Sequence, residues 1–318
     1  MLGFLIIPGF IFLLKGADMM VDGASAIARR YKVSPLVIGM TIIAFGTSAP
    51  ELTVNILASF RGNAGLAFGN IIGSNIANIL LILGISALIH PIKVQSNTLY
   101  REIPFSLHAA VMLLFLGGDV IFDGAKQGIL SRSDGLALLS VFAIFIYYVW
   151  NLMKKSQEVE DIDIPEMEAW KAILFLILGL LGIALGGDWV VRGAVAIAKE
   201  FSVADDVIGL TIIAFGTSLP ELAASAVAAY KKQADLAIGN VVGSNIFNIF
   251  WVLGLSASIR PLPVGEQNLF DLILLLGVTF LLFGFLIKGT DRTLKRGPAA
   301  SMVLLYIAYV IYLGLYRL

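Results

Sequence analysis

The sequence predicts an all-α membrane protein with ten transmembrane helices, arranged as two inverted repeats of five helices each. Composition is the first reason: of 318 residues, 58% are hydrophobic and only 14% are charged, whereas soluble domains average about 45–50% and about 25%. The second reason is a series of ten apolar segments, each near the length of about 20 residues that crosses a bilayer. The third is an internal repeat that relates residues 16–91 to residues 186–261.

The ten predicted helices follow one another with mostly short connections. The first repeat, residues 1–153, holds five of them, at 3–29, 34–60, 66–89, 103–122 and 134–153. The second repeat, residues 169–318, holds the other five, at 170–198, 205–230, 236–259, 269–288 and 299–316. A linker at 154–168 joins the repeats, and no segment resembles a soluble domain. The chain 1–318 is therefore predicted to form a single membrane domain.

The repeat also predicts how the two halves are oriented. Adding 170 to a residue number in the first half gives its equivalent in the second, and residues 39–78 match residues 209–248 at 23 of 40 positions. Because each repeat holds an odd number of spans, the second copy must enter the membrane from the opposite side. Inverted repeats of this kind are common in secondary transporters.

Charged residues predict the orientation of the chain and exclude some functions. Loops after the odd-numbered spans carry 14 Lys and Arg residues and the opposite loops carry 6, which places the first set and the linker in the cytoplasm. Both termini are then extracellular or periplasmic. Formal net charge is zero and cysteine is absent, so the sequence indicates no nucleic-acid surface and no thiolate chemistry.

The motif AFGTSAPEL at 44–52 returns as AFGTSLPEL at 214–222. Pro50 has no N–H, so the carbonyl of Gly46 loses its helical partner and the span is predicted to break. In a bilayer, irregular backbone is tolerated only where it is buried in protein or lines a cavity. The motif therefore predicts two broken helices at the centre of the molecule.

The same motif places charge and hydroxyl groups beside the break. Glu51 follows Thr47 by four residues and Ser48 by three, so the three side chains can share one helical face. A charge at the bilayer centre costs at least about 2.5–3.5 kcal/mol and marks a functional site by default. The second motif repeats the arrangement with Thr217, Ser218 and Glu221.

A second motif supplies neutral oxygen ligands. GNIIGSNIANIL at 69–80 returns as GNVVGSNIFNIF at 239–250, and its glycines allow another helix to approach closely. Its polar side chains are spaced four apart on one face: Asn70, Ser74 and Asn78 in the first copy, and Asn240, Ser244 and Asn248 in the second. Hard cations such as calcium, magnesium and sodium prefer such oxygen ligands. Two carboxylates that meet near the midplane would repel, and a divalent cation, several monovalent cations or protons would balance them.

The paired motifs, GTSAPE with GNIIGSNIANI and GTSLPE with GNVVGSNIFNI, resemble the two α-repeats of the cation/calcium exchanger superfamily, in its sodium/calcium exchanger branch of prokaryotic type. The resemblance covers the whole chain and is most specific over 39–78 and 209–248. It implies a transporter, not an enzyme, that exports calcium in exchange for sodium by alternating access. Exchange of three sodium ions for one calcium ion, common in the family, would be electrogenic. The second, third, seventh and eighth spans would hold the ions, and the first and sixth would be sliding gate helices.

The resemblance also implies which atoms hold each ion. Calcium would be bound by Glu51 and Glu221 with the backbone carbonyls of Thr47 and Thr217. Sodium would use overlapping ligands. Asn78 and Asn248 would fill the middle positions of the site. Some relatives, notably the potassium-dependent branch, have an Asp at one of these two positions, so Asn at both argues against potassium dependence. The sodium ligands are the carbonyls of Ala44 and Ala214 and the side chains of Ser48, Ser74, Ser218 and Ser244. Beyond these ions and the bilayer of a plasma (inner) membrane, no cofactor and no obligatory protein partner is expected.

Three other functions remain open on the residues alone. A proton/calcium or other cation antiporter is possible because Glu51 and Glu221 can both titrate. A passive cation channel would share the ligands but show no countertransport. An intramembrane enzyme would need a nucleophile and a base, which the repeated motifs do not offer. Asp18 and Asp22, toward the end of the first span, are interpreted as solvated interfacial residues, with a gate-end or packing role as the alternative.

Overall fold

The computed structural model describes residues 2–61, 64–154, 167–201 and 214–316. Within these ranges it is an all-helical membrane protein, as predicted, with only four short strands. Eight described helices are long and apolar enough to cross a bilayer, and one bent pair makes a ninth. The predicted seventh span, 205–230, is described only from residue 214 onward, and most of the predicted linker, 155–166, lies outside the described residues.

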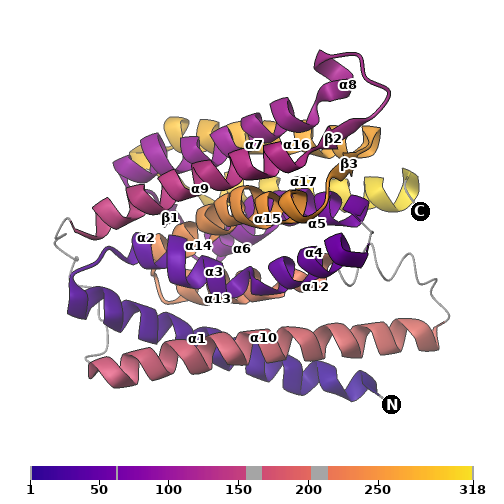
Figure 1. Cartoon of the computed structure of the whole chain (residues 1–318). Helices are drawn as coiled ribbons and strands as arrows, with labels where there is room; N and C mark the ends of the chain where they lie inside the picture. The colour runs from indigo at the N-terminus through magenta and orange to yellow at the C-terminus, as the bar shows by residue number, and fades with distance from the viewer. Residues whose placement is uncertain (1, 62–63, 155–166, 202–213, 317–318) are drawn as a thin grey trace.

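The first and sixth spans form a layer of their own (Figure 1). They are α1 (Ile6–Tyr31), preceded by a short 3₁₀ turn at Leu2–Leu5, and α10 (Ala169–Glu200). The two helices pack along each other over most of their length. A methyl group added at Gly186 of α10 would lie 2.5 Å from the backbone nitrogen of Leu13, and one at Gly16 of α1 would lie 2.7 Å from that of Ile183. Only glycine allows this approach.

The broken spans lie between this pair and the rest of the bundle (Figure 1). The second span consists of α2 (Pro35–Ile38), a π-helical turn (Gly39–Ile43), α3 (Ala44–Thr47) and α4 (Ala49–Arg61). It bends by 46° between Thr47 and Ala49, so the break predicted from Pro50 is confirmed. In the second half, α12 (Ala214–Thr217) and α13 (Leu219–Tyr230) are interrupted at the equivalent Ser218.

Among the unbroken spans that the structure describes, the third and the eighth are the most buried. The third consists of α5 (Ala64–Ala77), a π-helical turn (Asn78–Ile82) and α6 (Leu83–Ile89). The eighth consists of α14 (Ala234–Ile246), a π-helical turn (Phe247–Leu253) and α15 (Gly254–Ile259). A methyl group at Gly243 would lie 2.6 Å from Cα of Met40, so this glycine allows α14 to pack closely against the second span, as predicted. At the equivalent Gly73 a methyl group would meet no described atom within 4 Å, so the prediction is wrong for that glycine.

The remaining four spans cover the other side of the broken helices (Figure 1). They are α7 (Ile103–Gly117), α9 (Arg132–Met153), α16 (Glu266–Lys288) and α17 (Arg296–Tyr316). The predicted fourth span, 103–122, was wrong at both ends. A π-helical turn, Thr98–Glu102, extends the helix toward its start, and a short separate helix, α8 (Asp119–Phe122), follows Gly118. Glu102 is buried because it accepts a hydrogen bond from Tyr148 of α9, a contact that hydropathy cannot reveal.

Two small antiparallel sheets join the halves of the chain. β1 (Ile92–Lys93) pairs with β4 (Thr293–Leu294), and β2 (Gly128–Leu130) pairs with β3 (Leu262–Val264). Each sheet takes one strand from a loop of the first half and one from a loop of the second. The halves are therefore interlocked in the loops as well as in the helices.

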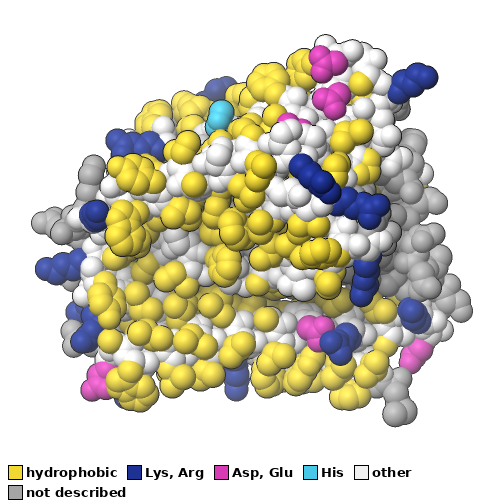
Figure 2. All heavy atoms as spheres, viewed as in Figure 1, with side chains coloured by type: hydrophobic (Ala, Val, Ile, Leu, Met, Phe, Trp, Pro, Cys, Tyr) yellow, Lys and Arg dark blue, Asp and Glu magenta, His cyan; other side chains and the backbone are white. Residues whose placement is uncertain are grey.

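The surface fits a bilayer. Figure 2 shows hydrophobic side chains across the middle of this face, with most Lys and Arg side chains toward its two ends. Large exposed apolar residues occur on many outer helices, among them Leu14, Phe115, Tyr147, Leu178 and Leu304. The N and C marks lie at the same end of the bundle in Figure 1.

Candidate cation site

Two glutamates form the centre of the candidate site. Glu51 lies in the first turn of α4 and Glu221 in the first turn of α13, each directly after its helix break. Both residues are 1% exposed, and their carboxylates lie close enough to interact electrostatically. A helix N-terminus favours negative charge through the macrodipole, so the breaks create a suitable environment for buried carboxylates. Each half of the chain thus contributes one carboxylate to a single buried region.

Hydroxyl groups of the motifs connect the halves around these carboxylates. Ser48 Oγ donates a hydrogen bond to Glu221 Oε1 at 2.8 Å. Ser218 Oγ donates to Ser74 Oγ at 3.4 Å, and Ser74 in turn lies beside Glu51 together with Thr217. Ser244 and Thr47 lie beside Glu221 in the equivalent way. The structure therefore brings together the glutamate, serine and threonine side chains that the sequence singled out.

Several oxygens in this region have no hydrogen-bond partner among the described residues. Buried polar atoms are nearly always paired, because an unpaired one costs about 1–3 kcal/mol. A cation would satisfy these atoms, since every one of them is an oxygen with a free lone pair. The unpartnered oxygens are the two carboxylate oxygens of Glu51, Glu221 Oε2, Ser244 Oγ, Asn78 Oδ1 and Asn248 Oδ1.

The donor set indicates a hard cation. In the described part of the chain, no group of three or more His, Cys, Asp or Glu side chains gathers, so the candidate site combines two carboxylates with neutral oxygens. This combination suits hard cations such as calcium, magnesium, sodium or manganese, and it offers none of the sulfur or imidazole ligands that softer transition metals prefer. The carbonyl of Ala44, a predicted ligand, already accepts a hydrogen bond from the Ser48 nitrogen at 3.0 Å. Ala214 begins α12, and its side chain is not described.

Sequence reasoning missed the hydrogen bonds that the asparagines of the second motif make across the site. Asn78 Nδ2 donates to Asn245 Oδ1, and Asn248 Nδ2 donates to Asn75 Oδ1, both at 3.0 Å. These two hydrogen bonds are equivalent under the 170-residue offset, and both cross between the halves. In addition, Asn240 accepts from Thr47 Oγ1 at 3.1 Å and donates to the carbonyl of Glu221 at 3.4 Å. Repetition of Asn75 and Asn245 in the two GSN words was the signal that could have found them.

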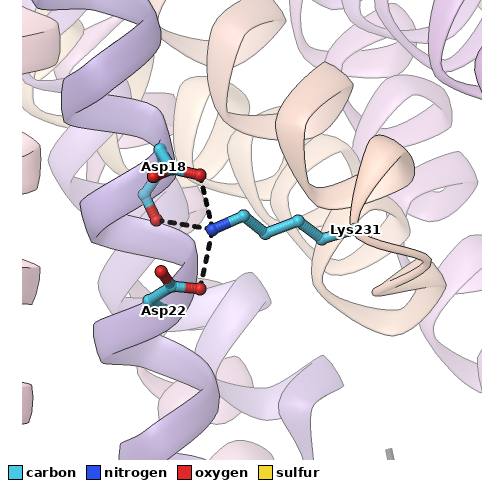
Figure 3. A network of polar contacts seen from close by, with 3 residues as sticks. All are labelled: Asp18, Asp22 and Lys231. Carbon is cyan, nitrogen blue, oxygen red and sulfur yellow. Dashed lines mark hydrogen bonds and ion pairs between the residues drawn. The ribbon is translucent and has the colours of Figure 1, made fainter. Parts of the chain in front are cut away.

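A second polar cluster lies at the end of α13 (Figure 3). Lys231 Nζ lies 2.5 Å from Asp18 Oδ1 and 2.7 Å from Asp22 Oδ1, and it donates to the Asp18 carbonyl at 3.2 Å. Partial burial acts to lower the pKa of Lys231, but its contacts with the two aspartates raise it above the ordinary value. The cluster ties α1 to α13. Interfacial solvation, predicted for Asp22, is therefore wrong: its side chain is 24% exposed and paired.

Helices broken beside buried carboxylates, with an all-oxygen site shared by two halves of the chain, define a membrane transporter of cations. Residues 1–151 and 171–315 match the family model described as sodium/calcium exchanger protein, so the chain belongs to the sodium/calcium exchanger family. It is therefore a transporter and not an enzyme, as predicted.

Individual relatives agree with this assignment over nearly the whole chain. The putative antiporter CaxA of Alkalimonas amylolytica is 38% identical over 316 residues, which cover 96% of each chain. The sodium/calcium exchanger MaX1 of Methanosarcina acetivorans is 32% identical in an alignment 347 residues long that covers 97% of each chain. A solved structure of the sodium-calcium exchanger NCX_Mj, soaked with 10 mM sodium and no calcium, superposes with a TM-score of 0.86 at 34% identity. It covers 98% of this chain and 99% of that one.

Proposed function

We propose that this protein exports calcium in exchange for sodium across the plasma (inner) membrane by alternating access. The observation that supports this function best is the meeting of Glu51 and Glu221 in one buried region, where several oxygens have no hydrogen-bond partner among the described residues. Two carboxylates balance the charge of one calcium ion, and the surrounding neutral oxygens suit sodium. Likeness to the sodium-calcium exchanger NCX_Mj adds support.

The proposed architecture is ten helices in two inverted repeats, residues 1–153 and 169–318, with both termini outside and the linker 154–168 in the cytoplasm. Reciprocal hydrogen bonds between repeat-equivalent asparagines support the pseudo-twofold relation. The pairing of loop strands across the halves also supports it. In such transporters one bundle moves against the other around a fixed site, and the separate pair of α1 and α10 is the proposed moving element.

Coupling follows from shared ligands. Calcium is assigned to Glu51, Glu221 and the carbonyls of Thr47 and Thr217. Sodium is assigned to overlapping atoms, so the two ions compete and each displaces the other on opposite sides of the membrane. These sodium ligands are the carbonyls of Ala44 and Ala214 and the side chains of Ser48, Ser74, Ser218 and Ser244. Asn78 and Asn248 fill the middle positions of the site, where their oxygens are available to either ion. Exchange of three sodium ions for one calcium ion would move one net charge, worth about 2.3 kcal/mol per 100 mV.

A proton-coupled calcium antiporter is the second candidate. It is favoured by the buried carboxylate of Glu51, because neither of its oxygens accepts a hydrogen bond from a described residue. Such a group can carry a proton as readily as it can bind a metal ion.

Calcium uptake into sodium-loaded proteoliposomes, diluted into sodium-free buffer, separates these functions. Sodium exchange predicts uptake that requires internal sodium, survives collapse of the pH gradient and is accelerated by an inside-positive potential. Uptake driven by a pH gradient without sodium would instead establish proton coupling. Uptake that needs no counter-ion would identify a channel.

The contact of Lys231 with α1 is expected to hold the conformation described above. Lys231→Gln removes both ion pairs between α1 and α13, and such pairs are worth up to about 1 kcal/mol, or roughly fivefold in a conformational equilibrium. The chain has no cysteine of its own, so cysteines introduced at the exposed positions Tyr31 and Tyr147 can be spin-labelled. The distance between the two labels reports the position of α1 relative to α9. Lys231→Gln is expected to shift the distance distribution, whereas Lys232→Gln should leave it unchanged. Equal distributions in both variants would show that the contact does not bias the conformation.

A further inference from the structure

An asparagine can present either of two opposite groups to a bound ion. Its amide oxygen is an acceptor and its nitrogen carries two donors, and only the oxygen binds a metal cation. Asn78 and Asn248 are buried, each 1% exposed, and each starts or lies within a π-helical turn. Their value as ligands depends on what holds the amide in one orientation.

Two other asparagines occupy the nitrogens. Asn78 Nδ2 donates to Asn245 Oδ1, and Asn248 Nδ2 donates to Asn75 Oδ1, both at 3.0 Å. Asn75 and Asn245 are themselves buried, at 0% and 2% exposure. Because each nitrogen is engaged by the opposite half of the chain, the oxygens of Asn78 and Asn248 are left without partners in the described structure.

The orientation of one pair is anchored in the backbone. Asn75 Nδ2 donates to the main-chain carbonyl of Asn245 at 3.3 Å, and a carbonyl can only accept. This contact fixes which end of the Asn75 amide is nitrogen, and so presents its oxygen to the nitrogen of Asn248. The orientation of Asn248 is thereby determined without reference to any bound ion.

The free oxygens belong to the candidate cation site. Asn78 lies one helical turn after Ser74, whose hydroxyl lies beside Glu51 and accepts from Ser218 of the other half. Asn248 lies one turn after Ser244, which lies beside Glu221. On both helices the serine and the asparagine are four residues apart and share a face.

We propose that Asn75 and Asn245 are positioning residues that turn the amide oxygens of Asn78 and Asn248 toward the transported cation. Each half of the chain thus orients a ligand carried by the other half. The two asparagines then present only hydrogen-bond acceptors to the middle of the site. This favours a dehydrated metal cation over any ligand that needs a hydrogen-bond donor. This inference rests on the proposed function, in that the ion occupies the region between Glu51 and Glu221.

A double-mutant cycle tests the orientation directly. Asn245→Ala frees the Asn78 amide to rotate, and calcium affinity is expected to fall at least tenfold. In an Asn78→Asp background the same Asn245→Ala change should alter calcium affinity less than threefold, because a carboxylate presents an oxygen in either orientation. A residue that merely packs the helices would instead cause the same loss in both backgrounds, and that additive result would overturn the proposal.

Equilibrium binding of radioactive calcium to the full chain in detergent is the measurement, with thermal unfolding as a check on folding. If Asn245→Ala does not fold, the equivalent cycle of Asn75→Ala with Asn248→Asp decides in the same way. Failure of the proposed calcium site itself is distinguishable, because the unmodified protein would then bind no calcium. Failure of the positioning role leaves that binding intact and makes the cycle additive.

Discussion

Replacing Glu51 with glutamine is expected to reduce sodium-dependent calcium uptake at least about hundredfold. The side chain is buried, and neither oxygen has a hydrogen-bond partner among the described residues. Each carboxylate forms a buried ion pair with the bound calcium, and removing one partner of a buried ion pair costs about 3–5 kcal/mol, or roughly two to four powers of ten in affinity. Glutamine keeps the shape but leaves Glu221 alone to balance a divalent ion. Initial rates of radioactive calcium uptake into sodium-loaded proteoliposomes measure the loss.

Glu102→Gln is the matched control for this variant. Glu102 is also a buried carboxylate within a span, and it is 1% exposed. It lies with Tyr148 in the outer layer, and a glutamine oxygen can still accept the tyrosine hydrogen bond. Uptake is expected to stay within about twofold of the unmodified rate, since a satisfied hydrogen bond is worth only about 1 kcal/mol. If both variants lost uptake equally, the special role of Glu51 would be refuted.

Gly186→Ala is expected to destabilise the protein by disrupting the packing of α10 on α1. The new methyl group would lie 2.5 Å from the backbone nitrogen of Leu13 and 2.7 Å from the carbonyl oxygen of Gly9. Backbone atoms cannot rotate away, so the helices must separate. Overpacking typically costs about 1–3 kcal/mol, which corresponds to a fall of roughly 2–5 °C in Tm for a chain of this length. Thermal unfolding of the detergent-solubilised chain measures it.

The next residue on the same helix provides the comparison. A methyl group at Gly187 would lie 3.6 Å from Cγ of Pro220, an ordinary van der Waals contact. Gly187→Ala should therefore leave Tm unchanged or raise it, because alanine is the better helix former by about 1 kcal/mol. Equal falls in Tm for the two variants would mean that close approach of α1 is not what requires glycine at 186.

Much of the fold could be predicted from the sequence because its signals are local. Hydropathy located the long spans, and Pro50 predicted the bend that the structure has between Thr47 and Ala49. The predicted fourth span missed the π-helical turn at its start and the break at Gly118 near its end. Glu102 in that turn contacts Tyr148, which is 46 residues away in sequence, so local hydropathy could not reveal its burial. Pairing of loop strands across the halves was likewise invisible, since neither partner is long enough to form a recognisable pattern.

The candidate site was predictable in its charges but not in its connections. Glu51 and Glu221 stood out because a carboxylate in an apolar span is costly and both copies carry one. Asn75 lies outside the face shared by Asn70, Ser74 and Asn78, so helical spacing alone did not select it. Its contact with Asn248 depends on how α5 and α14 cross. For the same reason, the partnership of Lys231 with Asp22 required the packing of α13 on α1.

A single cation site built from both halves of the chain predicts a definite binding stoichiometry. Equilibrium dialysis with radioactive calcium should find one calcium ion per chain, displaced competitively by sodium. Either Glu51→Gln or Glu221→Gln alone should abolish that binding at calcium concentrations that saturate the unmodified protein. Two calcium ions per chain, with half the binding retained in each variant, would contradict the shared site, because each glutamate would then bind its own ion.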